Sequence, residues 1–288
     1  MGYFLSIAIS IGIYIILSAS LNLIVGYGGI FDMGHGGFFA VGAYIAAIIT
    51  VRIGMPFFAE LLIAGFTAGV FGLAIGLPSI RLKGDYITLC SYGFAVVIYT
   101  IANNWLSVTN GPVGISSVFR PVILGLKFNS QASYLGLVTF ICIVCLLVIK
   151  RITGAPYGKT IEAIREDEIA ALACGKNISS VKIQIFVAGA FFAGIAGVLY
   201  AHYLMLADPT GFKPATSSLI LSMVVIGGLA SMKGSIAGAV LIITIPELLR
   251  IVGLSGFYAE QIQNIIYSLL FLVIIKLRPS GMFGKLKM

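Results

Sequence analysis

The chain has 288 residues, of which 59% are hydrophobic and 10% are charged, and its mean hydropathy is +1.09. Soluble domains carry about 25% charged residues, so a soluble fold of this size is excluded and lipid is the solvent that so much apolar surface needs. The net charge of +8 is the excess that Lys and Arg produce at the cytoplasmic ends of membrane helices, and we expect no binding to nucleic acid.

Apolar segments of the length that a bilayer needs, about 20 residues per helix, recur along the whole chain. We predict an all-α polytopic membrane protein with about nine hydrophobic spans, within a range of 8–10, and a cytoplasmic coupling helix. The first span lacks the basic start and the cleavage site of a signal peptide and is expected to be retained. Whether residues 215–230 span the membrane or form a re-entrant helix stays open. The predicted spans are 3–25, 36–51, 61–80, 86–106, 134–149, 183–205, 215–230, 235–249 and 260–275.

Polar and glycine residues interrupt the end of the first span. Asn22 is costly in an apolar segment unless it bonds another helix or lines a path. The glycines from Gly26 to Gly37 either break the helix beside a cavity or let helices pack tightly, and both interpretations remain open. Asp32 and His35 lie in the same segment and either pair or cap a loop.

Residues 150–182 hold six basic and four acidic side chains, 10 of the 28 charges in the chain. The uncharged segments 128–149 and 183–207 flank them, and both are long enough to span, so the charged residues form a loop on one face of the membrane. Placing this loop in the cytoplasm puts 13 basic residues inside and five outside, in agreement with the positive-inside rule. The N-terminus then lies outside.

The longest segment on the external side is predicted to be residues 107–133. It contains Thr109-Asn110-Gly111-Pro112, which is a turn signal. This external loop either offers surface to an external partner or has none.

The charged loop is predicted to contain a helix over residues 156–175. Pro156 suits its first turn and Gly175 suits its end. Arg165 is spaced to pair with Glu162 and Glu168. The apolar arc on the helical wheel consists of Ile161, Ile164, Ala171 and Leu172. A helix of mixed apolar and charged side chains fits a socket on another protein; the alternative is an amphipathic helix on the inner leaflet, which usually carries excess Lys and Arg.

Several catalytic and binding motifs are missing from the sequence. It has no Gly-x-x-x-x-Gly-Lys-Ser/Thr loop, so we do not expect it to bind ATP. With only His35 and His202 and no His-Glu-x-x-His, we expect no metal site. We identify no nucleophile–base pair, so we do not expect an enzyme. The four cysteines are predicted to be free thiols.

Several blocks of the sequence resemble the permeases of branched-chain amino acid ABC importers. Ala163-Ile164-Arg165-Glu166-Asp167-Glu168, followed by Ala170-Ala171 and Gly175, is similar to the coupling loop of that family, although Ile169 stands where the general ABC importer signature has Glu. Arg81-Leu82-Lys83-Gly84-Asp85-Tyr86 favours a LivM-type over a LivH-type subunit. The other blocks are Leu21-Asn22-Leu23-Ile24-Val25-Gly26-Tyr27-Gly28-Gly29, Gly34-His35-Gly36-Gly37-Phe38-Phe39, Thr109-Asn110-Gly111-Pro112-Val113-Gly114-Ile115, Tyr200-Ala201-His202-Tyr203, Gly227-Gly228-Leu229 and Pro246-Glu247-Leu248-Leu249-Arg250.

The resemblance implies that residues 1–288 form a single transmembrane permease domain in a prokaryotic cytoplasmic (inner) membrane. It implies a second, LivH-type permease, two ABC ATPase subunits that carry ATP-Mg, an extracytoplasmic substrate-binding protein, and no cofactor on this chain. A urea or amide importer of the same fold and an ion-coupled secondary transporter remain alternatives.

Two groups of site residues follow from these considerations. Charges at the bilayer centre cost several kcal/mol, so we expect the translocation path to be lined by small and uncharged polar groups. The path candidates are Asn22, Gly28, Gly29, Thr88 and Ser91. The expected ATPase-coupling residues are Glu162, Arg165, Glu166, Asp167, Glu168, Ala170, Ala171 and Gly175.

Overall fold

The computed structural model describes residues 2–79, 82, 84–123, 126–251, 265–267, 269, 272–273, 276 and 280–284. Helices make up nearly all of its regular structure, and its strands are pairs of two residues. The prediction of an all-α polytopic membrane protein is confirmed. The α-helices are α1 (Gly2–Asn22), α2 (His35–Ile48), α3 (Phe57–Ser79), α4 (Asp85–Asn104), α5 (Leu106–Thr109), α6 (Gln131–Gly154), α7 (Pro156–Glu166), α8 (Glu168–Ala173), α9 (Ile178–Leu204), α10 (Pro214–Gly227) and α11 (Met232–Ile251).

Shorter elements join or extend these helices. The π-helical turns η1 (Leu23–Tyr27) and η2 (Ile49–Ile53) continue α1 and α2, and the 3-10 turns are η3 (Gly111–Val113) and η4 (Pro209–Phe212). Strand β1 (Ile115–Ser116) pairs with β4 (Leu206–Ala207), and β2 (Val122–Ile123) pairs with β3 (Leu126–Lys127), both antiparallel.

Six helices in the described part of the chain are long and apolar enough to cross a membrane: α1 with η1, α2 with η2, α3, α4, α6 and α9. The 20-residue α11 covers the predicted span 235–249. Helix α10 has only 14 residues, about 21 Å at 1.5 Å per residue, which is short of the roughly 30 Å hydrocarbon core. The predicted span 215–230 is therefore a short helix that does not cross alone, and most of 260–275 lies outside the described residues.

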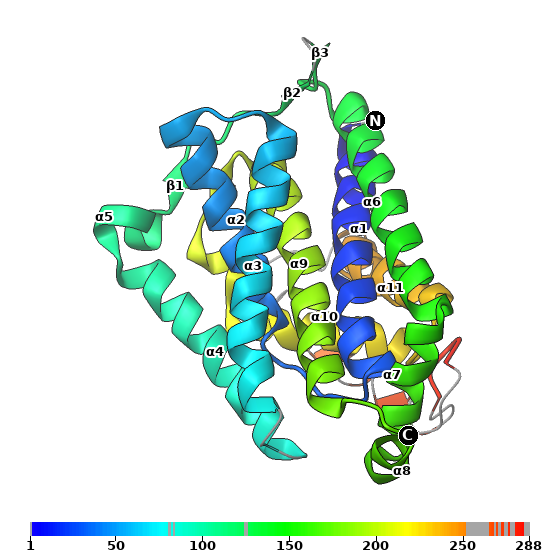
Figure 1. Cartoon of the computed structure of the whole chain (residues 1–288). Helices are drawn as coiled ribbons and strands as arrows, with labels where there is room; N and C mark the ends of the chain where they lie inside the picture. Colours follow the sequence, from blue (N-terminus) through cyan, green and yellow to red (C-terminus); the bar gives the residue numbers. More distant parts are fainter. Residues whose placement is uncertain are drawn as a thin grey trace.

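Helix α9 is central to the bundle and packs along α3 and α2 (Figure 1). One face of α3 is a glycine stripe that lets α9 approach closely. A Cβ at Gly65 would meet the Phe191 ring at 2.9 Å, and one at Gly72 would meet the Ala190 Cβ at 2.6 Å. Because lipid supplies no hydrophobic force between helices, such close contact between small residues is what holds them together. The stripe consists of Gly65, Gly69, Gly72 and Gly76.

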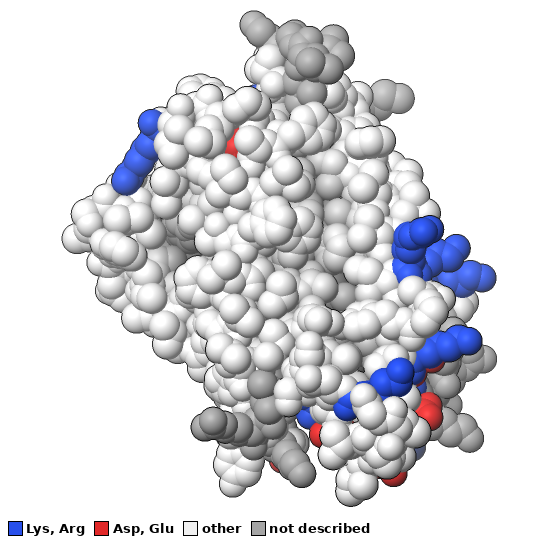
Figure 2. Space-filling model, in the orientation of Figure 1, with Lys and Arg blue, Asp and Glu red and all other residues white. Residues whose placement is uncertain are grey.

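The external and charged loops lie at opposite ends of the bundle. Helices α1 and α6 both begin at one end (Figure 1), where Gln131 Nε2 donates to Ser6 Oγ at 3.3 Å. Strands β1, β2 and β3, which belong to this external loop, lie toward the same end, while α7 and α8 lie at the other end. Figure 2 shows most of the visible basic side chains gathered toward the α7–α8 end. The N-terminus therefore lies on the face opposite the charged loop.

Asn22 joins α1 to the turn between α10 and α11. It is fully buried: its Nδ2 donates to the Ser231 carbonyl at 3.0 Å and to Ser235 Oγ at 2.7 Å, and its Oδ1 accepts from the Ala230 N–H at 3.0 Å. A Cβ at Gly26 would collide with Asn22 Oδ1, so glycine is needed there. Of the two interpretations of Asn22, the structure shows the bond to another helix.

Candidate functional site

The charged loop contains two helices rather than one. Helix α7 ends at Glu166, and Asp167 has an extended backbone (φ −153°, ψ 108°) before α8 begins. The Asp167 carboxylate accepts from the N–H groups of Ile169 (2.8 Å) and Ala170 (3.1 Å), which is the bonding of an N-cap residue. The prediction of a single helix over residues 156–175 is therefore wrong. The Asp167 side chain bonds the backbone N–H groups that follow it, which ends the first helix and caps the second.

This break turns the apolar side chains of the loop in two directions. Ile161 and Ile164 of α7 are buried, as the wheel predicts. Leu172, predicted on the same arc, is 61% exposed, and Ile169 is 81% exposed. The tip of α8 therefore presents two large apolar side chains to solvent. Sequence reasoning missed Ile169, because its exposure follows from the break, which the apolar pattern does not reveal.

The ion pairs of the loop also differ from the prediction. Among the described side chains, Arg165 pairs with neither Glu162 nor Glu168. Glu168 instead lies 2.6 Å from Lys182 Nζ of α9, and Arg165 lies 3.5 Å from Glu166, whose side chain is 73% exposed. Glu168 belongs to a different helix from Arg165, so the spacing rule for one continuous helix does not apply to them. Because the Glu166 side chain is open to solvent, its pairing with Arg165 contributes little to stability.

The end of the loop follows the predicted glycine stop. Gly175 has φ +75°, its N–H donates to the Leu172 carbonyl (2.9 Å), and the Lys176 N–H donates to the Ala171 carbonyl (3.1 Å). These two bonds are those of a helix end closed by a left-handed residue. The loop is also tied to α9 by Tyr157, whose hydroxyl donates to Gln184 Oε1 at 2.8 Å and whose pKa is raised by burial.

Arg165 points inward, away from the exposed tip. Its side chain is 13% exposed, and its Nη1 donates to the Gly26 carbonyl at 3.0 Å. Gly26 lies in η1, at the C-terminal end of the continuous helix that α1 and η1 form. Carbonyls at such an end lack helical partners, and the helix dipole favours a cation there. The Arg165 stem passes over Gly29 (φ +68°), where any Cβ would collide with it.

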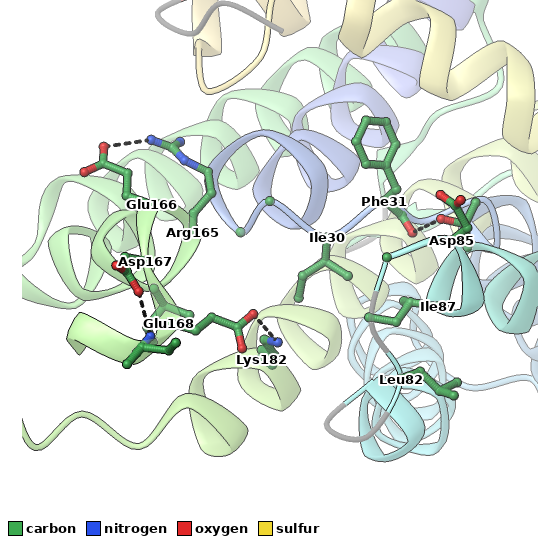
Figure 3. Close-up of a pocket in the computed structure, with 16 residues that line it drawn as sticks. Ile30, Phe31, Leu82, Asp85, Ile87, Arg165, Glu166, Asp167, Glu168 and Lys182 are labelled. Atoms are coloured by element: carbon green, nitrogen blue, oxygen red, sulfur yellow. Dashed lines mark hydrogen bonds and ion pairs between the residues drawn. The ribbon is translucent and has the colours of Figure 1, made fainter. Parts of the chain in front are cut away.

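A cavity of about 490 Å³ is lined by the charged loop, by the chain after α1 and by the start of α4 (Figure 3). Ile30 lies between these two sides, with Arg165 and Glu166 on one side and Asp85 on the other (Figure 3). The cavity therefore brings together predicted residues of both groups. Those that line it are Gly28, Gly29, Thr88, Arg165, Glu166, Asp167 and Glu168.

Two path candidates, Asn22 and Ser91, are not among the residues that line this cavity. Ser91 is fully buried, and its Oγ accepts from the Met33 N–H at 3.0 Å. Thr88, which does border the cavity, donates from Oγ1 to the Phe31 carbonyl at 3.2 Å. Both side chains of α4 thus hold the non-helical chain between α1 and α2. Asn22 lies on the α1 side of the same chain.

Asp32 and His35 form the pair that their positions allow. The Asp32 Oδ2–His35 Nδ1 distance is 3.3 Å, and both side chains are fully buried. Asp32 Oδ1 also accepts from the Gly34 N–H at 2.7 Å, and His35 Nε2 lies 2.8 Å from Ser20 Oγ of α1. These contacts hold the start of α2 against α1.

A second buried pair joins α3 to α9 near the external loop. His202 Nε2 lies 2.8 Å from Glu60 Oε2, and both side chains are at most 3% exposed. His202 Nδ1 lies 2.6 Å from the Phe119 carbonyl, and Thr50 donates to Glu60 Oε1 at 3.0 Å. A carbonyl only accepts, so His202 Nδ1 is the donor in the contact with Phe119. Glu60 was not among the predicted site residues, although an acidic residue at the edge of an apolar span is a signal of such a role.

The described residues contain no group of three or more side chains suited to a metal ion. The prediction of free thiols is confirmed: Cys142 and Cys145 are buried, Cys90 is half-buried and Cys174 is exposed, with no disulfide among them.

Comparisons with known proteins place the chain in a family. Residues 3–275 match the family described as branched-chain amino acid transport system / permease component. The chain is 36% identical over 261 residues to the high-affinity branched-chain amino acid transport system permease protein LivM of Escherichia coli K12. The alignment covers 83% of this chain and 61% of that protein, so the chain spans less than two thirds of the length of this relative. It is 26% identical over 314 aligned positions to the probable LivM of Methanocaldococcus jannaschii, and the alignment covers 94% of this chain and 90% of that protein. It is also 26% identical over 290 aligned positions to LivH of E. coli K12, and that alignment covers 94% of this chain and 91% of LivH. Because the family match extends over nearly the whole chain, this protein belongs to the branched-chain amino acid transport permeases.

Proposed function

We propose that the chain is the LivM-type permease subunit of an ABC importer and that, with a LivH-type permease, it forms the path for branched-chain amino acids. The observation that carries this proposal is the exposed tip of α8, where Ile169 and Leu172 project from a charged loop at one end of the bundle. Such a tip suits docking in a socket on another protein. Similarity to both LivM and LivH proteins supports pairing of two related permeases.

The remaining partners follow from the same proposal. The sequence has no phosphate-binding loop, so two separate ABC ATPase subunits supply ATP hydrolysis, and this chain holds no cofactor and catalyses no reaction. An extracytoplasmic binding protein delivers the substrate to the face that carries residues 107–133. The assembly sits in the cytoplasmic membrane of a prokaryotic cell, with α7 and α8 in the cytoplasm.

We propose further that the path offers no charged clamp for a zwitterionic substrate. The buried acidic residues described in the spanning helices and their connections already have partners: Asp32 pairs with His35 and Glu60 with His202. Of the path candidates, the small or neutral Gly28, Gly29 and Thr88 remain to contact the substrate, while most of the charged residues in the same cavity belong to the charged loop at its end of the bundle. Weak contacts favour release of the cargo, so selection among substrates rests mainly with the binding protein. Micromolar leucine binding by the purified permease pair alone would contradict this.

Uptake by vesicles that contain the complete complex tests the proposed function. Labelled leucine is expected to accumulate only when the ATPase side is supplied with ATP, and labelled urea is not expected to accumulate. Vesicles of the same preparation without ATP are the control. ATP-driven uptake of urea without leucine would support the urea or amide importer instead. Leucine uptake that follows a proton gradient and ignores ATP would support an ion-coupled transporter.

Labelling from outside the cell tests the proposed orientation. In a background without the four native cysteines, Ser130→Cys is expected to react with a membrane-impermeant thiol reagent, because Ser130 is exposed at the start of α6. Ser179→Cys, at the start of α9 beside the charged loop, is expected to be protected until the cells are permeabilised. The opposite pattern would reverse the orientation.

A further inference from the structure

Arg165 differs from the other charged side chains of the loop in the direction that it faces. Its side chain is 13% exposed, whereas that of the adjacent Glu166 is 73% exposed. The Arg165 guanidinium reaches the Gly26 carbonyl at 3.0 Å, across the gap between α7 and the end of α1. A bond from a charged donor is stronger than a neutral one, and the planar guanidinium loses little freedom in making it.

The chain that receives this bond leads to the path candidates. Residues 28–34, here called segment 28–34, connect η1 to α2 without forming a helix. On the α4 side, Thr88 and Ser91 bind the segment at Phe31 and Met33. On the α1 side, Asn22 binds the turn between α10 and α11. A displacement of the Gly26 carbonyl therefore acts on the chain between Asn22, which holds the α10–α11 turn, and segment 28–34, which α4 holds.

The space around segment 28–34 leaves room for such a displacement. The cavity of about 490 Å³ lies between the segment, the loop helices and the start of α4. The Arg165 stem also rests against Gly29, where no side chain separates it from the backbone. A shift of α7 would thus push or pull the chain at two nearby points, Gly26 at the end of η1 and Gly29 in segment 28–34. It would not first have to compress packed side chains in the cavity.

We propose that Arg165 is a positioning residue that transmits movement of the charged loop to segment 28–34, and that it is not part of the surface that binds the ATPase. This inference rests on the proposed function, because it assumes that an ATPase moves the loop. It assigns separate tasks to the two faces of the loop: the α8 tip binds the partner, and the inner face of α7 moves the permease.

The test compares ATP hydrolysis and leucine uptake in vesicles that contain the complete complex. Arg165→Met keeps the apolar stem over Gly29 and removes the donor to Gly26. It is expected to retain the ATPase subunits and their hydrolysis, while leucine taken up per ATP falls about tenfold, the size of an ordinary coupling free energy. Arg165→Lys, which keeps a cationic donor, is expected to recover much of the ratio. Lys159→Met is the matched control, because Lys159 is an exposed cation on the same helix.

Each outcome bears on one claim. A wild-type ratio of uptake to hydrolysis in Arg165→Met overturns the inference, and so does loss of the ATPase subunits from this variant, which would place Arg165 in the docking surface. If Arg165→Met fails to insert, Arg165→Gln decides by the same ratio, since its shorter neutral side chain does not reach Gly26. A wild-type complex that hydrolyses ATP without moving leucine contradicts the proposed function instead.

Discussion

Replacing Ile169 and Leu172 together with Glu is expected to detach the ATPase subunits while the permease itself stays inserted. Both side chains are largely exposed at the α8 tip, at 81% and 61%, so the substitution removes little packing within this chain. In the assembled complex they would be buried as apolar anchors, and a carboxylate buried there without a partner is costly. Anchors of this kind contribute about 2 kcal/mol each, so the pair is worth roughly a thousandfold in affinity.

Co-purification of the ATPase with the tagged permease pair measures this effect. The matched control exchanges the same two residues conservatively, Ile169→Leu with Leu172→Ile, and is expected to keep the ATPase bound. Insertion is checked by the yield and elution profile of the detergent-extracted permease. Normal recovery of the ATPase with the double Glu variant would show that α8 does not dock through these side chains.

The sequence predicts the membrane helices well because the hydropathy of a segment indicates whether it lies in lipid or in water. An uncharged run such as residues 128–149 has no stable place except across the bilayer, and in the structure these residues form most of α6, which is long and apolar enough to cross. The stop at Gly175 is predictable for an equally local reason, because a left-handed residue at a helix end favours glycine.

Other features escape sequence reasoning because two local tendencies compete or because the partners lie far apart. Asp167 either continues a helix or caps a new one, and only the packed structure shows that it caps α8. That choice then decides that Ile169 is exposed and that Glu168 pairs with Lys182. The contact of Arg165 with Gly26 joins residues 139 positions apart, so no periodicity within either segment predicts it.

The second large effect is expected at the buried pair between α3 and α9. His202→Phe removes the partner of Glu60 and leaves its carboxyl group buried, with Thr50 as its other hydrogen-bond partner among the described residues. Breaking a buried pair from one side costs about 3–5 kcal/mol, because the remaining group is desolvated without compensation. The free energy of unfolding of the purified permease in detergent, from denaturant or thermal transitions, is expected to fall by this amount.

Removing both partners separates the cost of a stranded carboxylate from a simple loss of packing. In the double variant Glu60→Leu with His202→Phe, no charge is left behind, and an apolar replacement of a buried pair is often nearly neutral. The double variant is therefore expected to be more stable than His202→Phe alone, although it lacks one more native side chain. A protease is still expected to cut residues 107–133 faster in the double variant than in wild type. The reason is that the Phe119 carbonyl has lost its donor, His202 Nδ1. If the two substitutions instead add in their cost, the pair does not act as a unit, and Glu60 stabilises α3 through contacts other than His202.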